Sequence, residues 1–163
     1  MENMTGKVWI LGDDIDTDII IPTEYLAMKT IDDMKQYAFS PLRPELAGQI
    51  QKGDIIVAGK NFGCGSSREQ APEIIKALGI QCVIAKSFAR IFFRNAINNG
   101  LLLIEQPDLY DDIKEGDTIT VHMNKHVDYN GKEYPIAALP DNLMRIIQAG
   151  GLVGAMRKLN GLD

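Results

Sequence analysis

The chain has little of several features that would assign its class at once. Its 163 residues contain two cysteines, Cys64 and Cys82, which excludes a disulfide-rich secreted scaffold and suits a reducing, cytoplasmic environment. No apolar run approaches about 18 residues, so we expect no membrane-spanning helix. Residues 1–12 lack a basic segment followed by an apolar one, so we expect no signal peptide. The net charge of −5 argues against nucleic acid or an anionic membrane as a partner.

What the chain does have is the composition of an ordinary globular protein. Hydrophobic residues make up 45% and charged residues 24% of the sequence, close to typical values. A length of 163 residues leaves room for a hydrophobic core within one unit. Because no repeat, linker or low-complexity stretch divides the chain, we expect one domain over residues 1–163.

A glycine-rich loop at residues 61–70, Asn-Phe-Gly-Cys-Gly-Ser-Ser-Arg-Glu-Gln, stands between an apolar run and a helical pattern. The run at 54–58 predicts a buried strand, and apolar residues at helix spacing predict a helix over 71–78. Gly63 and Gly65 allow a tight turn and a close approach of a ligand to the backbone. The sequence therefore predicts a strand, a glycine-rich loop and a helix in succession.

Ser66, Ser67 and Arg68 in this loop predict an anion site. Both serines are favourable N-cap residues, and the free N–H groups of a helix's first turn attract an anion. Arg68 adds a planar cation suited to a carboxylate. In a regular helix, positions 66 and 68 would point about 200° apart. Ser66 and Arg68 can therefore act together only if Ser66 lies in non-helical loop geometry, which the two glycines permit.

Other interpretations of the loop lead to other functions. A dinucleotide fingerprint would need a third glycine at position 68, and a phosphate-binding loop would end in Gly-Lys-Ser/Thr; neither is present. A plain helix cap with a solvated arginine remains open, as does a module that only binds carboxylates. Cys64, near a helix N-terminus, is an alternative nucleophile, although no histidine lies near it in the sequence.

The remaining patterns predict an α/β domain with a mostly parallel sheet and a small antiparallel portion. Two successive strand–helix–strand units predict parallel strands joined by right-handed crossovers. The alternating segment 117–122 predicts a half-buried strand, and Asn130-Gly131 predicts a hairpin turn before a second arm at 132–136. The other expected elements are strands at 7–11, 81–85 and 101–104, and helices at 30–39 (capped by Thr30), 88–99 (capped by Ser87, with Ile91, Phe92, Ala96 and Ile97 inward), 140–148 and 152–159.

Two clusters of potential metal ligands carry weaker signals. His122 and His126 are four residues apart, a spacing that suits metal binding on a helix, but this segment has the alternation of a strand. We therefore expect no metal ligands in the chain. The segment 12–18 contains four aspartates, but it lacks the glycine and glutamate of an EF-hand loop. An aspartate-rich turn is one interpretation of it.

The glycine-rich loop resembles the Gly-Cys-Gly-Ser-Ser-Arg-Glu loop of the 3-isopropylmalate dehydratase small subunits, and is similar to the swivelling C-terminal domain of aconitase. Gln70 stands where that family often has histidine. Residues 14–22, Asp-Ile-Asp-Thr-Asp-Ile-Ile-Ile-Pro, resemble the family's Asp-x-Asp-Thr-Asp-x-Ile-Ile-Pro segment. The run 87–92 is also matched closely and is interpreted as mainly structural, with Arg90 as a candidate to face the site. The resemblance covers nearly the whole chain and implies the swivelling β/β/α fold.

The function that the resemblance implies is the small subunit of a two-subunit hydro-lyase, which dehydrates and rehydrates an alkyl-substituted malate. A large subunit, in a heterodimer or heterotetramer, would carry a [4Fe–4S] cluster, since two thiols are too few for a cluster that usually takes about four. No cofactor is expected on this chain. Ser66 matches the family's catalytic base, and Arg68 would bind a substrate carboxylate and favour the serine alkoxide. Ser67 and Asp18 are carried over as substrate-binding residues.

The loop of Tyr25, Leu26, Ala27 and Met28 is expected to select the substrate. In homoaconitase-type members of the family, an arginine follows Tyr-Leu and meets an extra carboxylate. Ala27 takes that place here, and its apolar neighbours favour an alkyl group over a buried third carboxylate. We therefore expect 3-isopropylmalate, in leucine biosynthesis. Methylmalate and dimethylmalate remain alternatives, and homocitrate does too because Lys29 is a nearby cation.

Overall fold

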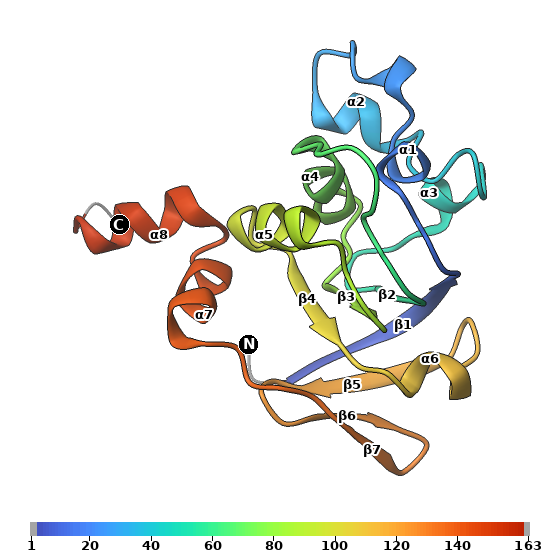
Figure 1. Cartoon of the computed structure of the whole chain (residues 1–163), viewed down its shortest axis with the longest axis vertical. Helices are drawn as coiled ribbons and strands as arrows, with labels where there is room; N and C mark the ends of the chain where they lie inside the picture. Colours follow the sequence, from blue (N-terminus) through green and yellow to red (C-terminus); the bar gives the residue numbers. More distant parts are fainter. Residues whose placement is uncertain (1–2, 162–163) are drawn as a thin grey trace.

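The computed structural model, which describes residues 3–161, is built around a seven-stranded sheet of order β4-β3-β2-β1-β5-β6-β7 (Figure 1). Parallel pairs join β1 to β4 through β2 and β3, and antiparallel pairs join β1, β5, β6 and β7. The predicted parallel sheet with an antiparallel portion is confirmed. The strands are β1 (Asn3–Leu11), β2 (Ile55–Ala58), β3 (Cys82–Ala85), β4 (Leu102–Glu105), β5 (Thr118–His122), β6 (His126–Tyr129) and β7 (Lys132–Pro135).

Strand β1 joins the two parts of the sheet because its two halves have different neighbours. Its first half, residues 3–7, pairs with β5, and its second half, residues 8–11, pairs with β2. The antiparallel part can therefore curl over one face of the parallel part. Inward side chains of β5, β6 and β7 accordingly share one buried cluster with β2: Val121, Val127, Tyr134, Ile55 and Val57.

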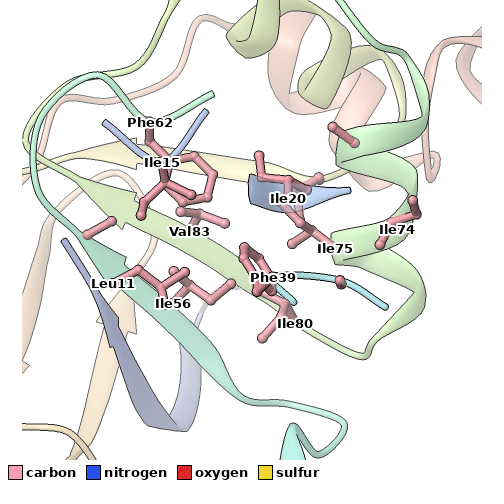
Figure 2. Close-up of a cluster of buried hydrophobic side chains, with 14 of the residues drawn as sticks. Leu11, Ile15, Ile20, Phe39, Ile56, Phe62, Ile74, Ile75, Ile80 and Val83 are labelled. Carbon is pink, nitrogen blue, oxygen red and sulfur yellow. The ribbon is translucent and has the colours of Figure 1, made fainter. Parts of the chain in front are cut away.

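Helices cover the opposite face of the parallel strands. Alternate strand residues such as Ile56 and Val83 point into a second cluster, where they meet Ile74 and Ile75 of α4 (Figure 2). The three layers are thus antiparallel strands, parallel strands and helices, which is the β/β/α arrangement that the resemblance implied. The helices are α1 (Thr17–Ile20), η1 (Thr23–Tyr25, a 3₁₀ turn), α2 (Ile31–Lys35), α3 (Leu46–Gln49), α4 (Gln70–Ala77), α5 (Arg90–Asn98), α6 (Leu109–Asp112), α7 (Asp141–Gln148) and α8 (Leu152–Leu159).

Helix lengths agree with the expected ranges except where tertiary contacts intervene. Thr30 caps α2 as predicted, accepting from Asp33 N–H at 3.1 Å. The helix expected over 30–39 nevertheless ends at Lys35, and Phe39 turns to φ +61° and donates its N–H to Ile20 O. Within residues 3–161, no helix combines the length and the apolar character needed to cross a bilayer.

Two expectations for the helix after β3 are wrong. Ser87 does not cap it, because its Oγ accepts from Asn61 N–H at 2.9 Å. Phe88 forms a parallel bridge to Phe62, so the chain stays extended and α5 begins only at Arg90. Ile91 is 59% exposed rather than inward, because it does not share the helix face on which Phe92 and Ala96 are buried. Phe92, Ala96 and Ile97 are buried as predicted.

Candidate functional site

Three loops meet at the carboxyl ends of the parallel strands, the edge at which open α/β sheets usually bind ligands. They follow β1 (residues 12–16), β2 (59–69) and β3 (86–89). Backbone hydrogen bonds hold the middle loop to both others, so the glycine-rich segment has a defined position rather than a free one. The N–H···O distances are 2.8 Å for Gly63 to Ile15, 2.9 Å for Thr17 to Cys64, and 3.0 Å for Phe62 to Ser87.

Gly63 is required at the point where the middle loop passes α5. Its φ is +84°, a region that residues with a Cβ adopt only at a cost. A Cβ at this position would also lie 2.1 Å from Cγ of Phe92. The loop therefore passes directly over the first turn of α5, with the ring of Phe92 beneath it.

Ser66 lies in a cleft of about 340 Å³ between this loop and the start of α5. Ser66 and Ser67 are exposed, and Ser66 is in a bend of the backbone rather than in α4. The non-helical geometry that joint action with Arg68 requires is thus present. The cleft is lined by Thr17, Gly63, Gly65, Ser66, Ser67, Arg68, Ala89, Arg90, Ile91, Phe92 and Asn95.

The helix N-terminus at this cleft belongs to α5, not to α4 as predicted. α4 begins at Gln70, and Glu69 is its N-cap, so neither serine caps that helix. α5 has Ala89 as its N-cap and no side-chain cap. The first N–H groups of a helix have no intrahelical acceptor, so those of α5 remain available beside Ser66. They contribute partial positive charge to the cleft that Ser66 lines.

Arg68 connects the glycine-rich loop to the segment after β1. Its side chain is 13% exposed and forms an ion pair with Asp18, with Nη1 2.7 Å from Oδ1. Nη1 also donates to Ile21 O at 3.0 Å, and Nη2 donates to Thr23 Oγ at 2.8 Å. These contacts fix the guanidinium at the side of the cleft. Two of the five N–H groups of a guanidinium are left without a partner among residues 3–161.

The four aspartates after β1 divide between structure and site. Asp13 accepts from Lys60 N–H and Asp14 from the Asn61 side-chain amide, at 2.8 and 3.0 Å. Asp16 caps α1. These three act as the aspartate-rich turn that one interpretation proposed. Asp18 alone among the four reaches Arg68, so the structure brings together two of the residues that the resemblance carried over.

The loop expected to select the substrate does not line the cleft. Tyr25 stacks on Tyr37, with ring centroids 4.1 Å apart, and both Leu26 and Met28 pack against the chain's own core. Ala27 is exposed. The structure thus brings together Ser66, Ser67, Arg68 and Asp18. It leaves residues 25–28 outside the cleft, on the far side of Thr23. The role of this loop stays a prediction.

The two thiols are unsuited to nucleophilic attack or to holding a cluster. Burial raises the pKa of Cys64, and Asp16 and Asp14 raise it further, so the thiolate is disfavoured. Burial raises the pKa of Cys82 to about 12 within β3. Cys64 does not line the cleft. Two cysteines in such positions do not fit a four-thiolate cluster.

Four cleft or loop residues were not identified from the sequence: Thr17, Thr23, Ile91 and Asn95. Thr17 belongs to the quoted family segment, which was a usable signal. Ile91 and Asn95, four residues apart, share the face of α5 that borders the cleft. Arg90, which was named as a candidate, does line the cleft at the first turn of α5.

Comparison with known proteins first identifies the class. Residues 15–109 match the family model described as the aconitase C-terminal domain, and this range contains the loops at 59–69 and 86–89 and the end of the loop at 12–16. The fold and the glycine-rich cleft are therefore those of an aconitase-type swivel domain.

More similar relatives identify the family. A 3-isopropylmalate dehydratase small subunit of Lachnospira eligens is 78% identical, covering 99% of both chains. A small subunit 1 of the same enzyme from Archaeoglobus fulgidus is 52% identical, covering 94% of this chain and 97% of that one. A crystal structure of 3-isopropylmalate dehydratase from Methanocaldococcus jannaschii superposes with a TM-score of 0.92 at 39% identity, covering 98% and 96% of the two chains. The chain belongs to the 3-isopropylmalate dehydratase small subunit family.

Proposed function

We propose that this chain is the small subunit of a two-subunit hydro-lyase that interconverts 3-isopropylmalate and 2-isopropylmalate in leucine biosynthesis. The observation that carries the proposal is the position of Ser66. Its hydroxyl lies in a non-helical bend, beside the uncapped start of α5 and in the same cleft as Arg68. The names of the relatives, down to 52% identity in an archaeal protein, support the same activity.

Ser66 is the proposed base. Dehydration must remove a proton from the carbon beside a carboxylate, which is a weak acid, so a strong base is needed. A serine hydroxyl is itself a weak acid, but partial positive charge from the α5 N–H groups and full charge from Arg68 favour its alkoxide. On hydration, the same hydroxyl returns the proton.

Arg68 is the proposed carboxylate ligand. Its two N–H groups without a described partner are available to a substrate carboxylate, while Asp18, Ile21 and Thr23 hold the rest of the guanidinium still. A guanidinium already fixed in position loses little conformational entropy when it binds. Asp18 therefore acts by orienting Arg68, rather than by proton transfer. Ser67 acts through its exposed hydroxyl.

The proposal requires a second chain for two reasons. The cleft that holds Ser66 and Ser67 is open to solvent, and water must be excluded for the alkoxide to be strongly basic. The cysteines of this chain also do not fit an iron–sulfur cluster. We propose that a large subunit covers the cleft and carries a [4Fe–4S] cluster, which would supply a Lewis acid for the departing hydroxyl.

Reconstitution tests the proposal. The isolated chain should be colourless, iron-free and inactive, and dehydratase activity should appear only when it is mixed anaerobically with the large subunit. Turnover by the isolated chain would contradict the two-subunit arrangement. Carboxylate binding by the isolated chain with no activity in any mixture would instead favour a carboxylate-binding module.

The substrate is proposed from the loop at residues 25–28. No cation lies at Ala27, and the apolar neighbours favour an alkyl substituent. The test compares kcat/KM of the reconstituted enzyme for isopropylmalate, methylmalate, dimethylmalate and homocitrate. Wild type should prefer isopropylmalate, and Ala27→Arg should move the preference toward homocitrate. Lys29→Ala is the control, because a preference that depends on Lys29 would assign the substrate carboxylate to that side chain instead.

A further inference from the structure

Both histidines of the chain lie in one side-chain cluster on the antiparallel part of the sheet. The sequence contains two histidines, and the expectation that they share one strand is wrong. His122 ends β5 and His126 begins β6, and the two are paired directly across the hairpin. Their ring centroids are 4.7 Å apart. Asp128, two residues further along β6, faces the same side of the sheet and joins them.

The donor atoms of this cluster converge on one point. Nε2 of His122 lies 2.7 Å from Oδ2 of Asp128, and Nε2 of His126 lies 3.1 Å from Oδ1 of the same carboxylate. One donor atom from each of the three residues lies within 4.8 Å of the other two. Tetrahedral ligands at zinc bond lengths of about 2.0–2.1 Å stand about 3.3 Å apart, so small side-chain movements would bring all three donors to one ion.

Both ring nitrogens of His122 face oxygen atoms. Nδ1 lies 3.0 Å from Asn3 Oδ1, and Nε2 faces the Asp128 carboxylate. Both neighbours are oxygen acceptors, whereas a neutral imidazole has a single N–H. If Nδ1–H donates to Asn3, as ligand histidines commonly donate to an oxygen behind them, the lone pair of Nε2 points at a carboxylate. In that arrangement, Nε2 and the Asp128 carboxylate can both serve as ligands of one cation.

The surroundings of the cluster supply a further negative charge and a route from solvent. Glu133 on β7 places Oε2 3.5 Å from Nε2 of His126, so the site has a second carboxylate in reach. His122 also borders an open cleft of about 490 Å³ between the hairpin and α7, through which an ion can enter. All three cluster residues are partly buried, which limits the number of competing waters.

We propose that His122, His126 and Asp128 bind a divalent transition-metal ion of the Zn²⁺ type, with Glu133 or water as the fourth ligand. Two imidazoles and a carboxylate suit Zn²⁺ better than Mg²⁺ or Ca²⁺, which prefer oxygen ligands. The ion would join β5 to β6 beside the first residue of β1 described here. Its role is structural, because none of its ligands lines the Ser66 cleft.

Titration of the isolated, tag-free and metal-free chain with Zn²⁺ tests the site. Calorimetry should show one saturable ion per chain, and Co²⁺ in its place should give the visible absorption of a tetrahedral complex. His122→Gln and His126→Gln should each weaken binding by at least about tenfold, and Asn3→Ala, behind the first ligand, by about tenfold. Because an ion that binds only the folded state stabilises it, Zn²⁺ should raise the Tm of wild type.

Controls separate this site from other zinc-binding groups. Cys64→Ser should bind Zn²⁺ like wild type, since the thiol lies on a different loop. The double variant His122→Gln/His126→Gln should keep the circular dichroism spectrum of the fold but lose the Tm response. Absence of saturable binding to wild type would overturn the proposal, as would binding that survives in the double variant.

Discussion

In the parallel part of the sheet, β2 and β3 bury every side chain, whereas in the antiparallel part β5 buries alternate ones and β6 and β7 bury one each. The parallel strands lie between two layers and are apolar on both faces. Their polar chemistry is therefore confined to the loops at their ends. The antiparallel strands have an open face, and polar side chains bond across that face itself.

Different kinds of hydrogen bond also stabilise the two regions. The loops of the parallel part are joined mainly through backbone groups, such as Gly63 N–H to Ile15 O. The antiparallel part uses side chains: Tyr129 and Tyr134 donate to Asp117 and Asp112 at 2.5 and 2.6 Å. Substitutions in the first region should thus affect activity, and those in the second should affect stability alone.

The largest effect should follow from removing the hydroxyl of Ser66. Ser66→Ala in the reconstituted enzyme should lower kcat about a thousand-fold, within the range that a positioned base contributes. Substrate affinity should change little, because Arg68 still holds the carboxylate. Steady-state kinetics and equilibrium substrate binding measure the two quantities. Cys64→Ala should remain active; an inactive Cys64→Ala beside an active Ser66→Ala would assign the chemistry to the thiol.

The next largest effect is a loss of stability on replacing a glycine by alanine, compared between one glycine from each region. Gly63→Ala should destabilise by about 2–5 kcal/mol, because it adds a left-handed alanine and a clash with Phe92. Gly131→Ala, at φ +79° in the β6–β7 turn with open space around it, should cost only about 1–2 kcal/mol. Urea unfolding of both variants measures the difference. Equal losses would mean that the loop over Phe92 is free to move.

A smaller effect is expected from substituting Arg68, the cation at the side of the cleft. Arg68→Lys should raise KM about tenfold to a hundredfold, since lysine keeps the charge but loses the planar pair of donors. kcat should change by a smaller factor than KM, because the variant loses only the part of the alkoxide stabilisation that the guanidinium supplies. Arg94→Lys, an exposed arginine on α5 outside the cleft, is the matched control and should leave both constants unchanged. A larger loss in kcat than in KM would make Arg68 primarily a partner of Ser66.

The same comparison explains which features the sequence could predict. The apolar runs of β2 and β3, and the alternation of β5, are local patterns, and both parts of the sheet followed from them. The role of Ser87 was predicted wrongly because the bridge between Phe62 and Phe88, a contact between distant segments, delays the start of α5. No local pattern contains that contact.

The site residues divide in the same way. Ser66, Ser67 and Arg68 lie within one motif, so their proximity was predictable. The pairing of Arg68 with Thr23 was not, because it depends on how the segment after β1 crosses the loop. The placement of His122 and His126 on one strand was predicted wrongly for a related reason. A turn at residues 123–125, with Asn124 at φ +63°, places them on opposite strands rather than on one.

The smallest predicted effect concerns the tyrosine–carboxylate bonds of the antiparallel part. The hydrogen bond from Tyr134 lowers the pKa of Asp112, so its stabilisation is present above the unfolded value of about 3.9 and is lost as pH falls through the lowered one. Burial and this bond raise the pKa of Tyr134 to about 12. That contribution is present below about pH 10 and is lost as pH rises toward 12.

Tyr134→Phe should therefore lower Tm by a few degrees at neutral pH, and the difference from wild type should shrink at both acidic and strongly alkaline pH. Thermal unfolding across the pH range measures this difference. Tyr110→Phe is the control, because the Tyr110 hydroxyl has no hydrogen bond to any residue in 3–161. Reconstituted kcat should be unchanged in both variants. A fall in kcat for Tyr134→Phe would break the division between a chemical and a structural part of the sheet, because it would couple the antiparallel face to the Ser66 cleft.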